Sequence, residues 1–484
     1  MTTSLCSSLG LRGRPWGLMP GLISGLLTIL LCSCIGASPA LAGPASVTDR
    51  EGLATEYRSW LDHGRTPTRF IDLVRRSSPG FTAIDLQALE FGASGSQIAR
   101  SRPGDRLLFI HRDRTAILVV VGEHPLASHG ARLIGAHIDT PSPRLSLVGL
   151  TPRGQRTVRA QAYGGVKLYH WLHRPLALVG RVARSGEDEI EIALGLQGDG
   201  FALYASQIVR GELVVTTGSI AADKKSRQPD HRAPTLMNAL NSRYGLVASD
   251  LRSAELYLVP AEKSREVGLD RGLIGGHGQD DRVNSYAAWR AIHDLEKTPP
   301  QTALVWLVDR EEVGSAHSIG AQSRFLEMVM AYLLRAQGGP ATELSLSRAL
   351  ARCRVISADT PPALNPNWPE VHESMNVPVL GRGPAMFPYT GREGKQRGSQ
   401  ARPELVRSVV ASFERAGAAL QFGVIGRVDE GGGGTIAKYL AERGMDVIDV
   451  GIPVVGMHSP LELTSKDDLW TGYLGFKAWL LDPP

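Results

Sequence analysis

Hydrophobic and polar positions alternate on two different scales between residues 265 and 484. Residues 303–308 and 447–455 form short apolar runs that predict buried strands. The apolar residues of 281–295 instead recur at helical spacing. Because strands here alternate with helices, this part of the chain is predicted to form a mostly parallel sheet covered on both faces.

The N-terminal half of the chain contains two further patterns. Residues 107–111 and 116–122 predict paired strands, and 132–139 predict a third. Residues 146–264 alternate polar and apolar positions in short runs separated by glycines, which is typical of β-structure. The predicted organisation is an α/β domain in two parts, with a β-rich domain inserted between them: residues 43–145, 146–264 and 265–484.

The first 42 residues have the pattern of a signal peptide. Arg12 and Arg14 precede an apolar stretch at 18–31, and Ala-Leu-Ala at 40–42 provides a small-residue cleavage site. This pattern predicts cleavage and export to the periplasm or the medium. A short membrane anchor is the alternative, but the apolar stretch is short for a span. No transmembrane span is expected in the mature chain.

Cysteine use is consistent with export without disulfides. The segment at 31–34, Leu-Cys-Ser-Cys, partly matches a lipoprotein cleavage site, so a lipid anchor at Cys34 is a second possibility. If cleavage follows Ala42, three of the four cysteines are removed and Cys353 alone remains. The mature chain then has no internal disulfide. Cys353 begins an apolar segment and is predicted to lie in the core.

Composition and charge argue against a polyanionic partner. The chain has 484 residues, 43% of them hydrophobic and 21% charged, as in ordinary globular proteins. Two of its five net positive charges, Arg12 and Arg14, lie in a leader that has no acidic residue. Elsewhere acidic and basic residues alternate without a basic stripe, and aromatics make up only 6%. Nucleic-acid binding is therefore not expected.

Residues with metal-binding chemistry gather at the carboxyl ends of the predicted strands and at one helix start, where open α/β sheets bind ligands. They are two histidines and several carboxylates, with no cysteine among them: His137, Asp139, Asp280, Asp281, Glu311, Glu312, Asp359 and His458. This set suits two divalent ions, with Zn²⁺ expected and Mn²⁺ or Co²⁺ as alternatives.

Two such ions, about 3.5–4 Å apart, can share a carboxylate and hold a hydroxide that attacks a carbonyl. A proton shuttle is still required, and one of two adjacent glutamates can serve while the other ligates. Each pattern alone has an ordinary explanation, such as an acidic pair at a helix N-terminus. Their occurrence together, in order along one chain, favours a hydrolytic metal site. A serine hydrolase is not supported, because no Gly-x-Ser-x-Gly motif is present.

Eight short motifs between residues 130 and 475 resemble one family. They are GAHID at 135–139, YGGVK at 163–167, GQDDRV at 278–283, DREEVGS at 309–315, SAD at 357–359, NPN at 365–367, VDEGGGG at 428–434 and MHSP at 457–460. On these motifs the chain resembles the aspartyl aminopeptidase and aminopeptidase I family of dinuclear zinc metallopeptidases. The glycine-rich segment is more similar to the bacterial aminopeptidase I branch.

The resemblance implies a specific set of metal ligands. Asp280 would bridge the two ions. His137 and Asp359 would complete one site, and Glu312 and His458 would complete the other. The implied fold is a zinc-peptidase-like α/β domain interrupted by a β-rich assembly domain.

The resemblance also implies roles outside the ligand set. Glu311 would act as general base and then acid, and Asp139 would orient His137. Lys395 matches a lysine near the active site of relatives, although an ordinary charged loop is an equal interpretation. Relatives often place a histidine of the inserted domain in a neighbouring active site, but residues 204–207 show no clear equivalent.

The leading functional hypothesis is a metal-dependent aminopeptidase that removes N-terminal residues from peptides. The resemblance also implies a homo-oligomer, with a dodecamer as the assembly of many relatives. Two alternatives remain at this point. One is a related dinuclear amidase or deacylase that acts on amides without a free amine. The other is an exported, non-catalytic metal-binding assembly protein.

Overall fold

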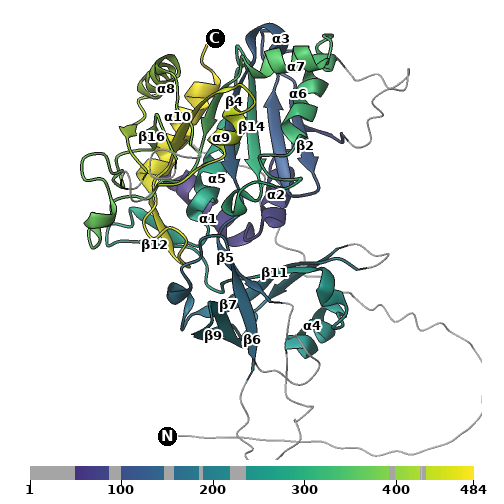
Figure 1. Ribbon diagram of the computed structural model, residues 1–484, viewed down its shortest axis with the longest axis vertical. Helices are drawn as coiled ribbons and strands as arrows, with labels where there is room; N and C mark the ends of the chain where they lie inside the picture. The colour runs from purple at the N-terminus through teal and green to yellow at the C-terminus, as the bar shows by residue number, and fades with distance from the viewer. Residues whose placement is uncertain are drawn as a thin grey trace, which may run out of the picture. The chain divides into compact units, whose positions relative to one another are not determined.

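The computed structural model describes residues 49–86, 100–146, 157–184, 189–218, 236–391, 398–425, 427 and 432–483. Its largest sheet has nine strands (Figure 1). The strands, in their order across the sheet, are β1 (Thr82–Ile84), β2 (Arg106–His111), β3 (Thr115–Val120), β14 (Thr302–Val308), β4 (Ala131–His137), β15 (Arg354–Ser357), β18 (Asp446–Gly451), β16 (Ala385–Phe387) and β17 (Gln421–Phe422).

Most neighbouring strands of this sheet are parallel. The central strands β14, β4, β15 and β18 all run in the same direction, and β1–β2 and β16–β17 are parallel as well. The antiparallel pairs are β2–β3, β3–β14 and β16–β18. The predicted mostly parallel α/β fold is therefore confirmed, and antiparallel pairs lie on either side of its central strands.

Helices cover both faces of the nine-stranded sheet. One hydrophobic cluster joins the sheet to α1 (Arg50–His63), α2 (Pro67–Arg76), α5 (Gln279–His293), α8 (Pro403–Arg415) and α10 (Lys466–Leu480). The other joins it to α3 (Leu126–His129), α6 (Phe325–Ala336), α7 (Glu343–Leu350) and α9 (Ala437–Ala441). Short 3-10 turns complete the described helices: η1 (Leu168–Trp171), η2 (Asp250–Ser253), η3 (Glu311–Val313) and η4 (Pro369–Val371).

Strand β14 is apolar from Ala303 to Val308, because it is covered on both faces. Val305 and Leu307 pack in the first hydrophobic cluster, whereas Leu304 and Trp306 pack in the second. Successive side chains of a strand point to opposite faces, so a strand covered on both faces has no solvent-facing position. Cys353, just before β15, is buried in the second cluster, as predicted for a small core residue.

A seven-stranded sheet forms the β-rich insertion (Figure 1). Its strands, in their order across the sheet, are β11 (Ala254–Pro260), β5 (Ser142–Leu145), β6 (Thr157–Tyr163), β10 (Glu212–Thr216), β9 (Leu203–Val209), β7 (Pro175–Val182) and β8 (Ile190–Leu194). β11 also pairs with β7. The sheet has its own hydrophobic cluster, to which α4 (Leu236–Tyr244) contributes Leu236 and Leu240. Its first strand, β5, lies just before residue 146.

A small third sheet carries the chain to the C-terminal helix. It consists of β12 (Arg265–Val267), β13 (Leu273–Gly276) and β19 (Glu462–Ser465). β13 leads directly into α5, and β19 leads into α10. The hydroxyl of Ser465 accepts hydrogen bonds from the N–H groups of Asp467 and Asp468 and so caps α10.

The helices of the described ranges include none with both the length and the apolar character needed to cross a membrane. The predicted leader at 1–42 lies outside the described residues.

Candidate active site

The topology brings most of the predicted site residues to one edge of the nine-stranded sheet. His137 is the last residue of β4, and Asp359 follows the end of β15 by two residues. Glu311 and Glu312 lie in η3, just beyond β14. β4 is parallel to both β14 and β15, so these strands end at the same edge. Residues that follow the carboxyl ends of these strands in the sequence are therefore neighbours in space.

Asp280 lies between the two histidines. Its Oδ1 is 3.4 Å from Nε2 of His137, and its Oδ2 is 3.0 Å from Nε2 of His458. Nε2 of His458 is also 3.6 Å from Oε1 of Glu312. Nε2 of His137 is 3.9 Å from Oδ1 of Asp359. The five residues thus form two groups that share the carboxylate of Asp280.

Both imidazoles direct the same nitrogen into the cluster. Nδ1 of His137 is 3.0 Å from the carbonyl oxygen of Asp139, and Nδ1 of His458 is 3.2 Å from the carbonyl oxygen of Gly165. A backbone carbonyl that receives the Nδ1 proton leaves Nε2 free as a ligand, which is how metal-binding histidines are usually held.

Burial disfavours the ionised forms of the carboxyl groups in the cluster. Burial raises the pKa of Glu311 to about 7. Burial and the charge of Asp280 raise the pKa of Glu312 well above its usual range, and burial does the same for the pKa of Asp359. Burial opposes ionisation of Asp280 too, but His137 and His458 outweigh it and lower the pKa of this carboxyl. Positive charge is needed to keep all four groups ionised together.

These residues fit divalent metal ions. Oδ1 of Asp280 and Oε1 of Glu312 are buried without a hydrogen-bond partner among the described residues, although such oxygens are normally satisfied. Ligand atoms of His137, Asp280 and Glu312 lie within 4.8 Å of one another, as do those of His137, Glu311 and Asp359. Carboxylate oxygens and imidazole nitrogens, without thiolates, are suitable ligands for zinc.

The cluster is not equally buried throughout. The side chain of His137 is 2% exposed, whereas those of Asp359 and His458 are 15% and 24% exposed. The site is therefore deepest at His137 and reaches solvent on the side of His458 and Asp359, from which a substrate can approach.

Asp139 has a wider role than the predicted orientation of His137. Its Oδ1 is 3.4 Å from Nδ1 of His137 and accepts a hydrogen bond from the N–H of Glu311 at 3.1 Å. Its Oδ2 accepts from the N–H of Glu312 at 3.2 Å and from the hydroxyl of Tyr163 at 2.7 Å. One carboxylate therefore holds both the first histidine and the turn that carries the two glutamates.

Glu462 holds the backbone of the same site and was not among the predicted residues. It is fully buried in β19 and accepts hydrogen bonds from the N–H groups of Gln279 at 2.5 Å and Asp280 at 3.3 Å. It also accepts from the N–H of His458 at 2.7 Å. Burial, aided by the charge of Asp280, raises its pKa to about 7. No sequence signal marks Glu462, because its partners are backbone groups.

Asp281, a candidate from the sequence, borders the cluster, with a carboxylate oxygen within 4.8 Å of ligand atoms of Asp280 and Asp359. Its carboxylate is fully buried and accepts hydrogen bonds from the N–H of His137 at 3.1 Å, from Asn284 at 2.6 Å and from Thr360 at 2.8 Å. These contacts fix the end of β4 against the start of α5. The peptide bond between Asp280 and Asp281 is cis.

The YGGVK motif at 163–167 contacts the site from the seven-stranded sheet. Gly164 has a φ of +69°, and a Cβ on it would lie 3.2 Å from Cβ of Glu312. A Cβ on Gly165 would lie only 2.7 Å from Nδ1 of His458. The glycines therefore let this backbone approach two predicted ligands. Lys395 and residues 428–431 of the glycine-rich motif lie outside the described residues.

Fold and site together define a metal-dependent peptidase. The family model described as "Aminopeptidase I zinc metalloprotease (M18)" matches residues 93–199 and 205–480. The chain belongs to this family of zinc metalloproteases, and it is a metal-dependent aminopeptidase.

Individual relatives are similar over most of their length. The "Probable M18 family aminopeptidase 1" of Borrelia garinii is 34% identical over 78% of this chain and 86% of its own. A crystal structure of an M18 aminopeptidase from Thermotoga maritima has 31% identity and a TM-score of 0.78, covering 89% of this chain and 96% of that one. The structure of the S. cerevisiae mApe1 dodecamer has 22% identity and a TM-score of 0.69, covering 88% and 97%.

The close approach of Gly165 to His458 leaves no room for a side chain at this position. In Gly165→Ala the added methyl group must displace the imidazole of His458, so metal content and activity should fall, the activity by about 10–100-fold. Metal analysis and cleavage of a leucyl reporter measure both effects. Gly80→Ala is the matched control, because a Cβ there meets nothing within 4 Å. Unchanged metal content and rate in Gly165→Ala would contradict this role.

Proposed function

We propose that the aminopeptidase uses two divalent ions that share Asp280. His137 and Asp359 would hold one ion, and Glu312 and His458 would hold the other. The observation that carries this proposal is the position of Asp280, whose two carboxylate oxygens face two different histidines. Zinc is the expected metal from the family and the ligand set, with manganese or cobalt as alternatives.

Bound ions of this kind polarise the carbonyl to be attacked and make water nucleophilic near neutral pH. The protein must then move a proton from that water to the leaving amine. Glu311 is suited to this role, since it stands in the same turn as Glu312 and is not needed as a ligand. Asp139 fixes the turn through the N–H groups of both glutamates. Glu311 thus accepts the proton and later donates it to the amine.

The adjacent glutamates allow a matched test of these roles. Glu311→Gln should retain both ions but lose about 10²–10⁴-fold in kcat, because the amide cannot carry the proton. Glu312→Gln, the same change one residue away, should lower metal content as well as activity. Both variants are assayed for metal stoichiometry and for cleavage of a leucyl reporter. Retained activity in Glu311→Gln would contradict its assignment as the base.

The substrate class is tested with the mature chain from Gly43. Leucyl, aspartyl, glutamyl and N-blocked leucyl reporters are compared with and without a chelator. We expect cleavage of free-amine substrates only. The chelator should abolish this cleavage, because the ions polarise the carbonyl that is attacked. The preferred free-amine reporter then identifies the N-terminal specificity. Cleavage of the blocked substrate would favour the deacylase, and metal binding without any cleavage would favour a non-catalytic role.

We also propose that the β-rich domain at 146–264 mediates assembly into a homo-oligomer. The proposal is supported by S. cerevisiae mApe1, which shares this fold and whose solved structure is a dodecamer. Within this domain, large apolar side chains that a monomer would expose include Tyr169 at 78%, Phe201 at 49% and Val247 at 48%. Light scattering of the mature chain should report a mass several times that of one chain. A monomer at micromolar concentration would contradict assembly.

The leader is proposed to direct export, followed by cleavage before Gly43. The charged start, the apolar stretch and the Ala-Leu-Ala site support this proposal. Expression of the full chain should give an extracytoplasmic product whose first residue is Gly43 on N-terminal sequencing. A lipidated product beginning at Cys34 would show the alternative anchor, which Cys34→Ala should abolish. Retention of the uncleaved chain in the cytoplasm would contradict export.

A further inference from the structure

Arg310 connects the turn at 309–312, called the catalytic turn because it carries Glu311, to the seven-stranded sheet. It stands between the end of β14 and Glu311, and its backbone is left-handed, with a φ of +71°. Its Nη2 donates to Oε1 of Glu255 at 2.6 Å, and its Nη1 donates to the hydroxyl of Tyr257 at 3.2 Å. Both partners lie on β11 of the other sheet. Its guanidinium also lies 5.5 Å from the ring centre of Tyr163.

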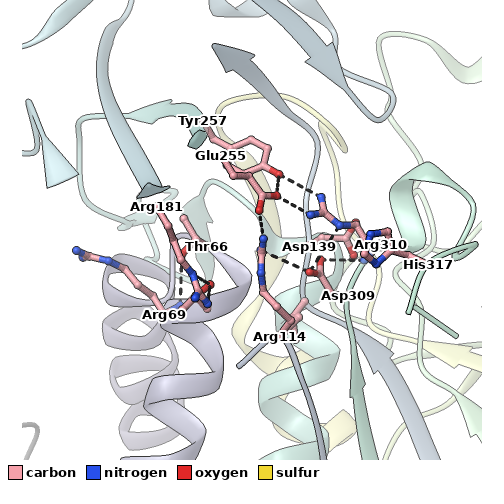
Figure 2. A network of polar contacts seen from close by, with 12 residues as sticks. Thr66, Arg69, Arg114, Asp139, Arg181, Glu255, Tyr257, Asp309, Arg310 and His317 are labelled. Atoms are coloured by element: carbon pink, nitrogen blue, oxygen red, sulfur yellow. Dashed lines mark hydrogen bonds and ion pairs between the residues drawn. The ribbon is translucent and has the colours of Figure 1, made fainter. Parts of the chain in front are cut away.

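Glu255 joins two arginines at the centre of this contact (Figure 2). Its Oε2 accepts a hydrogen bond from Arg114, and Nη1 of Arg114 lies 3.5 Å from the fully buried Oδ2 of Asp309. The side chains of Arg114, Arg310 and Glu255 are only 12%, 13% and 20% exposed. Removing the charge of Glu255 would leave two largely buried arginines with less compensation.

The turn is therefore held from two directions. On one side, Asp139 accepts the N–H groups of Glu311 and Glu312. On the other, Glu255 fixes the side chain of Arg310, the residue before Glu311. A non-glycine residue keeps a left-handed backbone only where its surroundings hold it. If Arg310 relaxes, the direct peptide link moves Glu311.

We propose that Glu255 is a positioning residue for the aminopeptidase reaction, acting through Arg310 on the catalytic turn. This role rests on the proposed function of Glu311 as the base. Displacing a catalytic group by about 1 Å can cost 100-fold in rate. The inserted sheet thus holds the catalytic turn as well as contributing to the fold.

A second ion pair provides the contrast that tests this role. Arg69 of α2 pairs with Glu191 of β8, so it also connects a helix of the α/β domain to the seven-stranded sheet. Within the described ranges, the hydrogen-bond partners of these two side chains do not include the 309–312 turn, and Figure 2 shows Arg69 apart from the group around Glu255. Glu191→Gln therefore removes the same charge from a second link, between α2 and the seven-stranded sheet, at a more exposed side chain (48% for Glu191, 20% for Glu255), without touching the turn.

The experiment compares Glu255→Gln with Glu191→Gln in the full metal-loaded enzyme. For Glu255→Gln we expect kcat to fall by about 10-fold or more, while KM and metal content stay near those of the unmodified enzyme. Glu191→Gln should leave kcat unchanged. Thermal unfolding is measured for both variants, since loss of an ion pair can lower stability in either. Equal kcat values, or a loss of kcat that follows loss of metal or folded protein, would overturn the proposal.

A double variant tests whether Glu255 acts through Arg310. If it does, Glu255→Gln combined with Arg310→Gln should lose no more kcat than Arg310→Gln alone. Additive losses would overturn this route. Glu311→Gln is assayed alongside. If it remains active, the base assignment fails whatever the Glu255 result. If it is inactive while Glu255→Gln is unaffected, only the positioning role fails.

Discussion

The shared carboxylate of Asp280 is the contact around which the site is organised. One of its oxygens faces His137 and the other faces His458, and the carboxylates of Glu312 and Asp359 lie on either side. Burying so many acids together is unfavourable unless positive charge compensates them. The crowding of carboxylates is unfavourable without cations, and it therefore favours the binding of divalent ions here.

Much of the surrounding structure keeps this charge in place. Asp139 and Glu462 are both buried, and each accepts hydrogen bonds from backbone N–H groups of the cluster's own residues. All three sheets take part, because His137 ends a strand of the large sheet, Glu462 lies in the small one, and Tyr163 reaches Asp139 from the inserted one. Hydrogen bonds to backbone groups orient the ligands without adding further side chains to the cluster.

The predicted elements and site residues follow from local chemistry. The apolar runs at β4 and β14 predict strands because both of their faces are covered, and His137 and Glu311 stand out because one ends such a strand and the other follows one. Glu462 and the link from Glu255 to Arg310 could not be found in this way. Each has partners at least 50 residues away in the sequence or partners that are backbone groups, and neither kind leaves a local pattern.

The covered parallel sheet, the β-rich segment and the residue types of a metal peptidase could be predicted from the sequence, because periodicity and ligand chemistry are properties of short segments. Tertiary packing places Asp280 between the two histidines and brings Tyr163 and Glu255 of the seven-stranded sheet into contact with Asp139 and Arg310, next to the turn at 309–312. Such contacts depend on how distant strands and helices pack, which no single segment encodes.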